Sequence, residues 1–166
     1  FFTRRKEEKH FWKSFVKNNS KKANQLMHYR LDTWKKMELN IKIAGIFMIL
    51  LSLMHIGFPR YFKWEIELKK VSLINKQLME VHTFFVAFTV FLMGILCMIS
   101  SNDLINSMLG RRISMGLGVF WGLRLFIQLF GFSSSLWKGK TFETSIHFLF
   151  IIIWIYFTIS FLILFL

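Results

Sequence analysis

A continuous apolar stretch runs from Val81 to Asn102 and contains no Asp, Glu, Lys or Arg. A helix rises about 1.5 Å per residue, so a stretch of this length crosses the roughly 30 Å hydrocarbon core of a bilayer. Inside lipid every backbone amide must be paired within the segment, and a helix meets that condition. The pattern therefore predicts a membrane-spanning helix.

Three further apolar stretches have the length of a span, and polar segments separate them. Pro59 is expected to end the first span, because it lacks an amide donor, and Ser72 is a candidate N-cap for the second. Asn102 and Asp103 are capping candidates in the turn before the third span, with Gly110 as a breaker. The predicted spans are about 41–57, 79–101, 113–132 and 144–166. The predicted fold class is an all-α membrane protein, a four-transmembrane up-down-up-down helix bundle over residues 41–166.

Residues 1–40 have a different pattern, with aromatic and apolar residues at helical spacing among lysines. We expect basic amphipathic helices here, with a break at 18–20, where the sequence reads Asn-Asn-Ser. Such helices are typical of the surface of an anionic leaflet, and docking of a partner subunit is the other interpretation. A solvated juxtamembrane helix would have the same pattern. Nucleic acid is not favoured as a partner, because no RNA-binding motif accompanies the charge.

The net charge of +13 is concentrated near the N-terminus, since residues 1–42 hold 12 Lys and Arg against four acids. Counting every Lys and Arg by side gives 14 against 7 and predicts a cytoplasmic N-terminus. The count limited to residues near the spans, which the positive-inside rule prefers, leaves the two sides nearly equal. The single Cys, Cys97, excludes a disulfide framework and a CxxC redox motif. The chain also contains no P-loop, GxSxG or HExxH motif and no His-rich di-iron box.

The few polar groups of the spans fall in one half of the predicted bundle. His55, His82 and His147 lie near the ends of three spans on the face opposite the N-terminus. The third span adds Gln128 roughly 6 Å and Arg124 roughly 12 Å below its end at that face. Glu80 and Glu143 follow at the same face as the nearest acidic side chains.

Two kinds of site could use these groups. Three neutral imidazoles can ligate a transition metal, and two that face one another can hold a haem, so His55, His82 and His147 are candidate metal ligands. An intramembrane arginine needs an anion or a carbonyl, which a quinone-like or anionic ligand would supply. The candidate ligand-binding residues are Arg124, Gln128, Glu80 and Glu143. Alternatively, the histidines are interfacial groups bonded to carbonyls and water, and Arg124 snorkels.

The motifs LINKQ (73–77), VHTFF (81–85), FWGLRLFIQLF (120–130) and LWKGK before His147 resemble an uncharacterised bacterial family of small four-span membrane proteins. The resemblance covers roughly residues 43–166 and implies a bacterial inner-membrane protein without assigning an activity. Whether the protein is an enzyme stays open at this point. Two other functions stay open beside the binding site: a non-catalytic accessory or assembly subunit, and a small homo-oligomeric pore or carrier.

Overall fold

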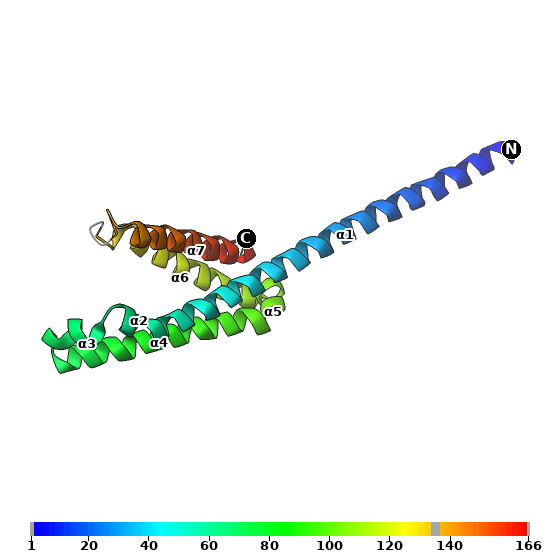
Figure 1. The fold of residues 1–166 in the computed structure, drawn as a ribbon. Helices are drawn as coiled ribbons and strands as arrows, with labels where there is room; N and C mark the ends of the chain where they lie inside the picture. Colours follow the sequence, from blue (N-terminus) through cyan, green and yellow to red (C-terminus); the bar gives the residue numbers. More distant parts are fainter. Residues whose placement is uncertain (1, 134–136, 166) are drawn as a thin grey trace. The chain divides into compact units, whose positions relative to one another are not determined.

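The computed structural model describes the backbone of residues 2–133 and 137–165, and their side chains apart from residues 2–16 and 18. Every element in this part of the chain is helical. The elements are α1 (Phe2–Met54), η1 (His55–Gly57), α2 (Phe58–Tyr61), α3 (Trp64–Glu67), η2 (Leu68–Lys70), α4 (Leu73–Ile99), α5 (Ser101–Asn106), α6 (Met108–Phe130) and α7 (Thr141–Phe165) (Figure 1).

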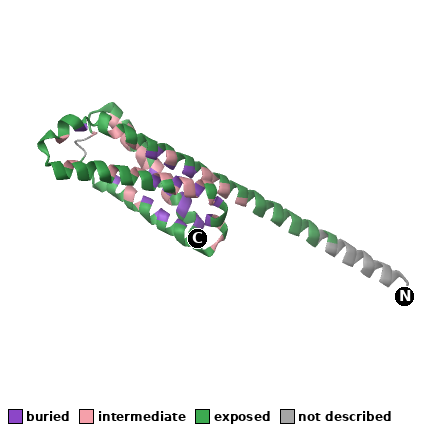
Figure 2. Ribbon diagram, turned by 90° about the horizontal axis from the view of Figure 1, so that it is seen from below, coloured by how far each residue is buried: buried purple, intermediate pink, exposed green. Residues whose placement is uncertain are grey.

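Four helices are long and apolar enough to cross a membrane, as the sequence predicted. They are the segment Asn19–Tyr61, which is largely α1, and the helices α4, α6 and α7. Their outward faces carry large apolar side chains, such as Phe84 with 63% and Ile152 with 64% of the side chain exposed. Figure 2 shows the buried residues on the faces where these helices meet. Lipid is the solvent that suits such a surface.

Backbone contacts divide the chain into two units, one up to Met37 and one from Glu38 to Leu166. In the first unit, every side chain from Asn19 to Thr33 is exposed. The predicted break at 18–20 is wrong, because α1 passes through these residues without interruption. Asn and Ser lower helix stability by only a fraction of a kcal/mol each. The hydroxyl of Ser20 also donates back to the Lys17 carbonyl at 2.9 Å, which lets it sit inside the helix.

In the second unit, α1 and α4 touch through their backbones. A methyl group added at Gly45 would lie 2.9 Å from the carbonyl oxygen of Gly94, and one added at Gly94 would lie 2.8 Å from that of Gly45. The buried Cys97 of α4 packs beside Gly45. Small residues permit this close approach, which is a common way for helices to associate in lipid.

The end of α7 is joined to α1 by polar contacts. The hydroxyl of Tyr156 donates to the side-chain oxygen of Asn40 at 2.9 Å, and the Asn40 amide donates to Ser160 Oγ at 3.1 Å. The ring of Phe47 packs edge-on against Tyr156. These contacts connect the first and last spanning helices.

The largest buried side chains lie between α6 and α7. The indole of Trp121 stacks on that of Trp154 with ring centres 5.1 Å apart, and Phe157 packs against Trp121 at 4.7 Å. Nearby, Gly118 admits Leu162, whose Cδ2 would lie 2.7 Å from a methyl group added to the glycine. Figure 1 shows the two helices side by side. This aromatic core fixes α6 against α7.

The connections differ from the sequence expectation in two places. The predicted turn at 100–112 contains helix α5, and Gly110 lies inside α6 and breaks no helix. Gly110 serves a different purpose, because an added methyl group would overlap the backbone of Asp103. Ser72 precedes α4 as predicted, but its side chain makes no capping hydrogen bond. Ser107 caps α6 by accepting from the Gly110 amide at 2.8 Å.

Candidate functional site

A line of polar side chains connects α6 to α7. Arg124 Nη1 donates to Gln128 Oε1 at 3.0 Å, within α6. Gln128 Nε2 lies 2.9 Å from Nδ1 of His147 on α7, and the His147 ring stacks on Trp137 at 4.6 Å. Gln128 is buried, whereas Arg124 and His147 are half-buried. Three residues predicted from the sequence to lie in one half of the bundle are thus in one hydrogen-bonded chain.

The chemistry of the donors fixes the direction of this chain. A guanidinium can only donate, so Gln128 must accept from Arg124 through Oε1 and turn its amide nitrogen to His147. That nitrogen can only donate, so Nδ1 of His147 must accept. The arrangement therefore requires a His147 ring without a proton on Nδ1.

Arg124 is held among neutral partners. Its guanidinium carbon lies 5.0 Å from the ring centre of Trp154 and 5.8 Å from that of Phe132, both within cation–π range. In the described part of the chain the one ion pair joins Lys42 to Glu38, so Arg124 has no carboxylate beside it. Aromatic faces and an amide stabilise the charge without cancelling it, and the guanidinium remains able to bind an anion.

Two cavities adjoin this line. An inner cavity of about 140 Å³ is lined from all four spanning helices and includes Arg124, Trp121 and Trp154. An outer cavity of about 310 Å³ includes Gln128, His147 and Glu143 between aromatic walls. Phe150 lines both cavities, so the two are neighbours. A ligand with a polar head and an apolar body would find both kinds of surface here.

The three histidines do not form a metal site. Among the residues that the structure describes, no group of three or more His, Cys, Asp or Glu side chains is placed to hold a metal ion. His82 is exposed on α4, and His55 lines the inner cavity with its Nδ1 2.8 Å from the Leu51 carbonyl oxygen. His147 has Gln128 as its partner. The predicted convergence of the three rings is therefore wrong.

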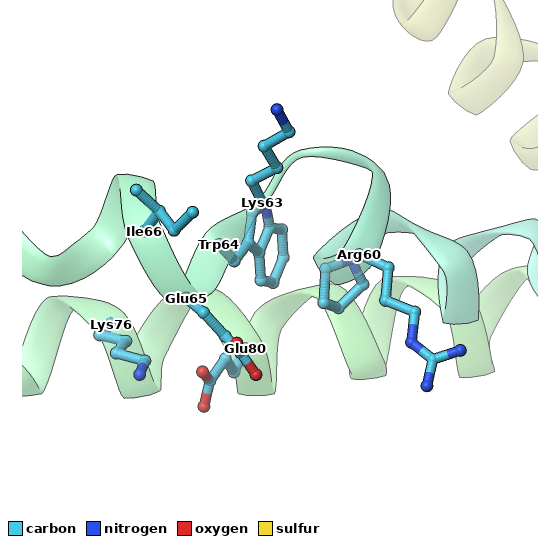
Figure 3. A pocket seen from close by; sticks show the side chains of 8 residues that line it. Arg60, Lys63, Trp64, Glu65, Ile66, Lys76 and Glu80 are labelled. Carbon is cyan, nitrogen blue, oxygen red and sulfur yellow. The ribbon is translucent and has the colours of Figure 1, made fainter.

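The two predicted acidic partners of Arg124 lie elsewhere. Glu143 lines the outer cavity without reaching Arg124. Glu80 is exposed and lines a surface cleft of about 530 Å³ with Glu65, Lys76 and Trp64, and it also lines a cavity of about 270 Å³ with His55. In Figure 3 the carboxylates of Glu65 and Glu80 end in the same part of this cleft. The cleft is a mixed-charge surface feature that the sequence reading did not predict.

The cations of this cleft do not converge on a common point. In Figure 3 the side chains of Arg60 and Lys63 extend away from the two carboxylates. Lys63 has a left-handed backbone, with φ of 49°, where the chain turns between α2 and α3. This conformation costs a non-glycine residue roughly 1–2 kcal/mol. The turn precedes the buried Trp64, which lines the cleft together with Lys76 and Glu80 of α4.

The sequence indicated that Trp154 shares the face of His147, but it did not predict that Trp121 and Trp154 stack on each other beside Arg124. The Nε1 atoms of Trp121, Trp137 and Trp154 are buried and have no hydrogen-bond acceptor among the described protein atoms. Trp121 lies three residues before Arg124, and Trp154 seven residues after His147, so helical spacing places each on the relevant face. The spacing of the tryptophans along α6 and α7 was therefore sufficient to place Trp121 and Trp154 on these faces.

Comparisons with protein-family models, curated proteins and solved structures give no match to this chain. The functional argument therefore depends on the geometry of the site.

Proposed function

We propose that this protein is an integral membrane protein that binds the anionic or carbonyl head of an amphipathic, membrane-soluble ligand at Arg124, Gln128 and His147. The observation that carries the proposal is the half-buried Arg124, which has an amide and aromatic rings as partners and no carboxylate. A central intramembrane arginine costs about 2.5–3.5 kcal/mol on insertion scales. Such a cost is usually retained for a functional partner, and a ligand head would supply one.

The proposal includes an up-down-up-down arrangement of α1, α4, α6 and α7. It is supported by the contacts between neighbouring helices. Residues early in one helix meet residues late in the other. On α1 and α7, Asn40 meets Ser160, while His55 shares the inner cavity with Phe150. On α6 and α7, Gly118 meets Leu162 and Gln128 meets His147. Antiparallel neighbours give this pattern.

We also propose that the protein lies in a bacterial inner membrane with its N-terminus in the cytoplasm. This proposal is supported by the basic composition of residues 1–42 and by the resemblance of the spans to a small bacterial membrane family. In this orientation the outer cavity lies near the non-cytoplasmic end of the bundle. Ligand would then enter from the bilayer or from the outer leaflet.

A binding measurement with two defined probes tests the proposed function. We expect the purified full chain in detergent to bind laurate or decylubiquinone in isothermal titration calorimetry. Arg124→Gln should weaken the binding at least tenfold, because it removes the positive charge that would pair with the ligand head. Arg112→Gln is the matched control, since Arg112 is exposed and contacts Met108 in its own helix. The proposal is wrong if neither probe binds, or if both arginine variants behave alike.

A further inference from the structure

The outer cavity has mainly aromatic walls. Its volume is about 310 Å³, near the lower limit of the roughly 300–1,000 Å³ that small-molecule sites occupy. The aromatic and aliphatic part of its lining consists of Tyr61, Phe62, Phe132, Trp137, Ile146 and Phe150. Tyr61, Phe62 and Phe132 are exposed, so the cavity opens onto the surface of the bundle. A single flat ring suits a space of this size and lining, and an attached tail can extend out of it.

His147 offers a hydrogen-bond donor to this cavity. Its Nδ1 accepts from the Gln128 amide at 2.9 Å, and a neutral imidazole carries its one proton on the other nitrogen, so Nε2 donates. Among the described residues, the buried side-chain nitrogens without a hydrogen-bond partner are those of Trp121, Trp137 and Trp154. Nε2 of His147 has no partner in this part of the chain and is not one of these three, so it keeps accessible surface. Because His147 lines the outer cavity, Nε2 is available to a ligand there.

The charges around the outer cavity favour an uncharged ligand. Glu143 lies one helical turn before His147 on α7, lines the same cavity and makes no ion pair with a described residue. In the described part of the chain no Lys or Arg lines this cavity, since Arg124 lines the inner one. A carboxylate head seated here would be repelled by Glu143, because like charges in a poorly solvated space repel strongly. A neutral carbonyl accepts from His147 without that cost.

We propose that the outer cavity binds the ring of a membrane quinone. One ring carbonyl accepts from Nε2 of His147, and the aromatic side chains of the wall contact the faces of the ring. The opposite carbonyl accepts from Arg124, which lines the adjoining inner cavity and has N–H groups beyond the one that Gln128 engages. The proposal rests on the proposed function and narrows its ligand class from anionic or carbonyl heads to neutral quinones.

The first test compares three ligands with alkyl chains of similar length on the unchanged protein. We expect decylubiquinone to bind the full chain at least tenfold more tightly than laurate, which is anionic, and methyl laurate, which is neutral but has no ring. Calorimetry in one detergent measures all three. Equal or tighter binding of laurate or methyl laurate would overturn the quinone assignment and leave the proposed function standing. If no ligand binds, both proposals fail together.

The second test removes the Nε2 donor of His147 while keeping an aromatic ring against Trp137. His147→Phe should weaken decylubiquinone binding about tenfold, because the hydrogen bond to the carbonyl is lost. His82→Phe is the matched control, since His82 is exposed on α4, and it should leave the binding unchanged. A thermal melt of each variant checks the fold. Equal affinities of the two histidine variants would contradict a contact between His147 and the quinone.

An infrared difference spectrum separates hydrogen bonding from packing. A hydrogen bond lowers the stretching frequency of a quinone carbonyl. Bound decylubiquinone should therefore show a shifted carbonyl band in the unchanged protein and in His82→Phe, and this band should be missing in His147→Phe. The same carbonyl spectrum from both variants would overturn donation by His147.

Discussion

At the scale of single residues, Gln128 is the side chain on which the site depends. It accepts from Arg124 and donates to His147, so it connects a permanent charge on α6 to a titratable ring on α7. The amide satisfies both neighbours because it accepts through Oε1 and donates through Nε2.

Gln128→Glu tests whether the free charge of Arg124 is what binds a ligand. The new carboxylate would lie at the position of an atom now 3.0 Å from Nη1 of Arg124 and would cancel its charge. We expect laurate binding to fall at least tenfold, measured by calorimetry. Gln77→Glu, on an exposed position of α4, adds the same charge without a nearby arginine and should leave binding unchanged. Unchanged binding by Gln128→Glu would contradict the role of the free guanidinium.

The sequence predicted the Arg124–Gln128 pair because residues four apart share a helix face. It also predicted His147 and Gln128 at the same end of the bundle, and the two side chains are within hydrogen-bond distance. It did not indicate that His82 is exposed. The direction in which a side chain points depends on the rotation of its helix against its neighbours. That rotation is decided by packing, and a sequence without a periodic polar seam does not reveal it.

At the scale of elements, two kinds of glycine occur in the spans. Gly94 lies in a helix crossing where the α1 and α4 backbones touch, whereas an added methyl group at Gly116 of α6 would meet nothing within 4 Å. On α6, Gly118 does admit a side chain of α7, that of Leu162. The tight crossing of α1 and α4 uses Gly45 and Gly94, which lie in the first and second spans.

Gly94→Ala is expected to destabilise the protein. Its methyl group would lie 2.7 Å from Cγ1 of Ile49 and 2.8 Å from a backbone oxygen, and backbone cannot move aside as a side-chain end can. Overpacking of this kind costs about 1–3 kcal/mol, which a thermal melt in detergent would register as a lower midpoint. Gly116→Ala should leave the midpoint the same or slightly higher, because alanine favours helix. Equal midpoints for the two variants would refute the tight crossing.

At the scale of the whole molecule, the prediction of an all-α chain with four helices long and apolar enough to cross a membrane is confirmed. Length and apolar composition were sufficient for that, because lipid leaves few alternatives to a helix. The short helices between Met54 and Leu73 were not predicted. Their formation depends on how Trp64 packs against α4, which local sequence does not determine.

The segment from Lys17 to Met37, in which most described side chains are exposed, is the part of the molecule that we propose contacts an anionic leaflet. Its described apolar side chains include Leu26 with 62% and Tyr29 with 74% exposed, and lysines flank this apolar group on both sides along the chain. Each lysine near an anionic surface contributes about 1 kcal/mol of attraction. The contact should therefore weaken with added salt.

Replacing Lys21, Lys22, Lys35 and Lys36 by Gln should weaken the contact at least tenfold. The full chain in phosphatidylcholine nanodiscs would be mixed with phosphatidylserine vesicles, and co-flotation would be measured. The same number of substitutions at exposed lysines of the connections is the control, at Lys69, Lys70, Lys138 and Lys140. Equal losses in the two variants would show a general charge effect and contradict docking by the N-terminal segment.

The parallel stacking of Trp121 on Trp154, with ring planes 13° apart, also has an optical consequence. The strong far-ultraviolet transitions of two indoles at this separation couple and split into a paired positive and negative band in circular dichroism. The folded chain thus contains an intrinsic chromophore pair at the wall of the inner cavity. Its spectrum would report small rotations of these rings without any attached label.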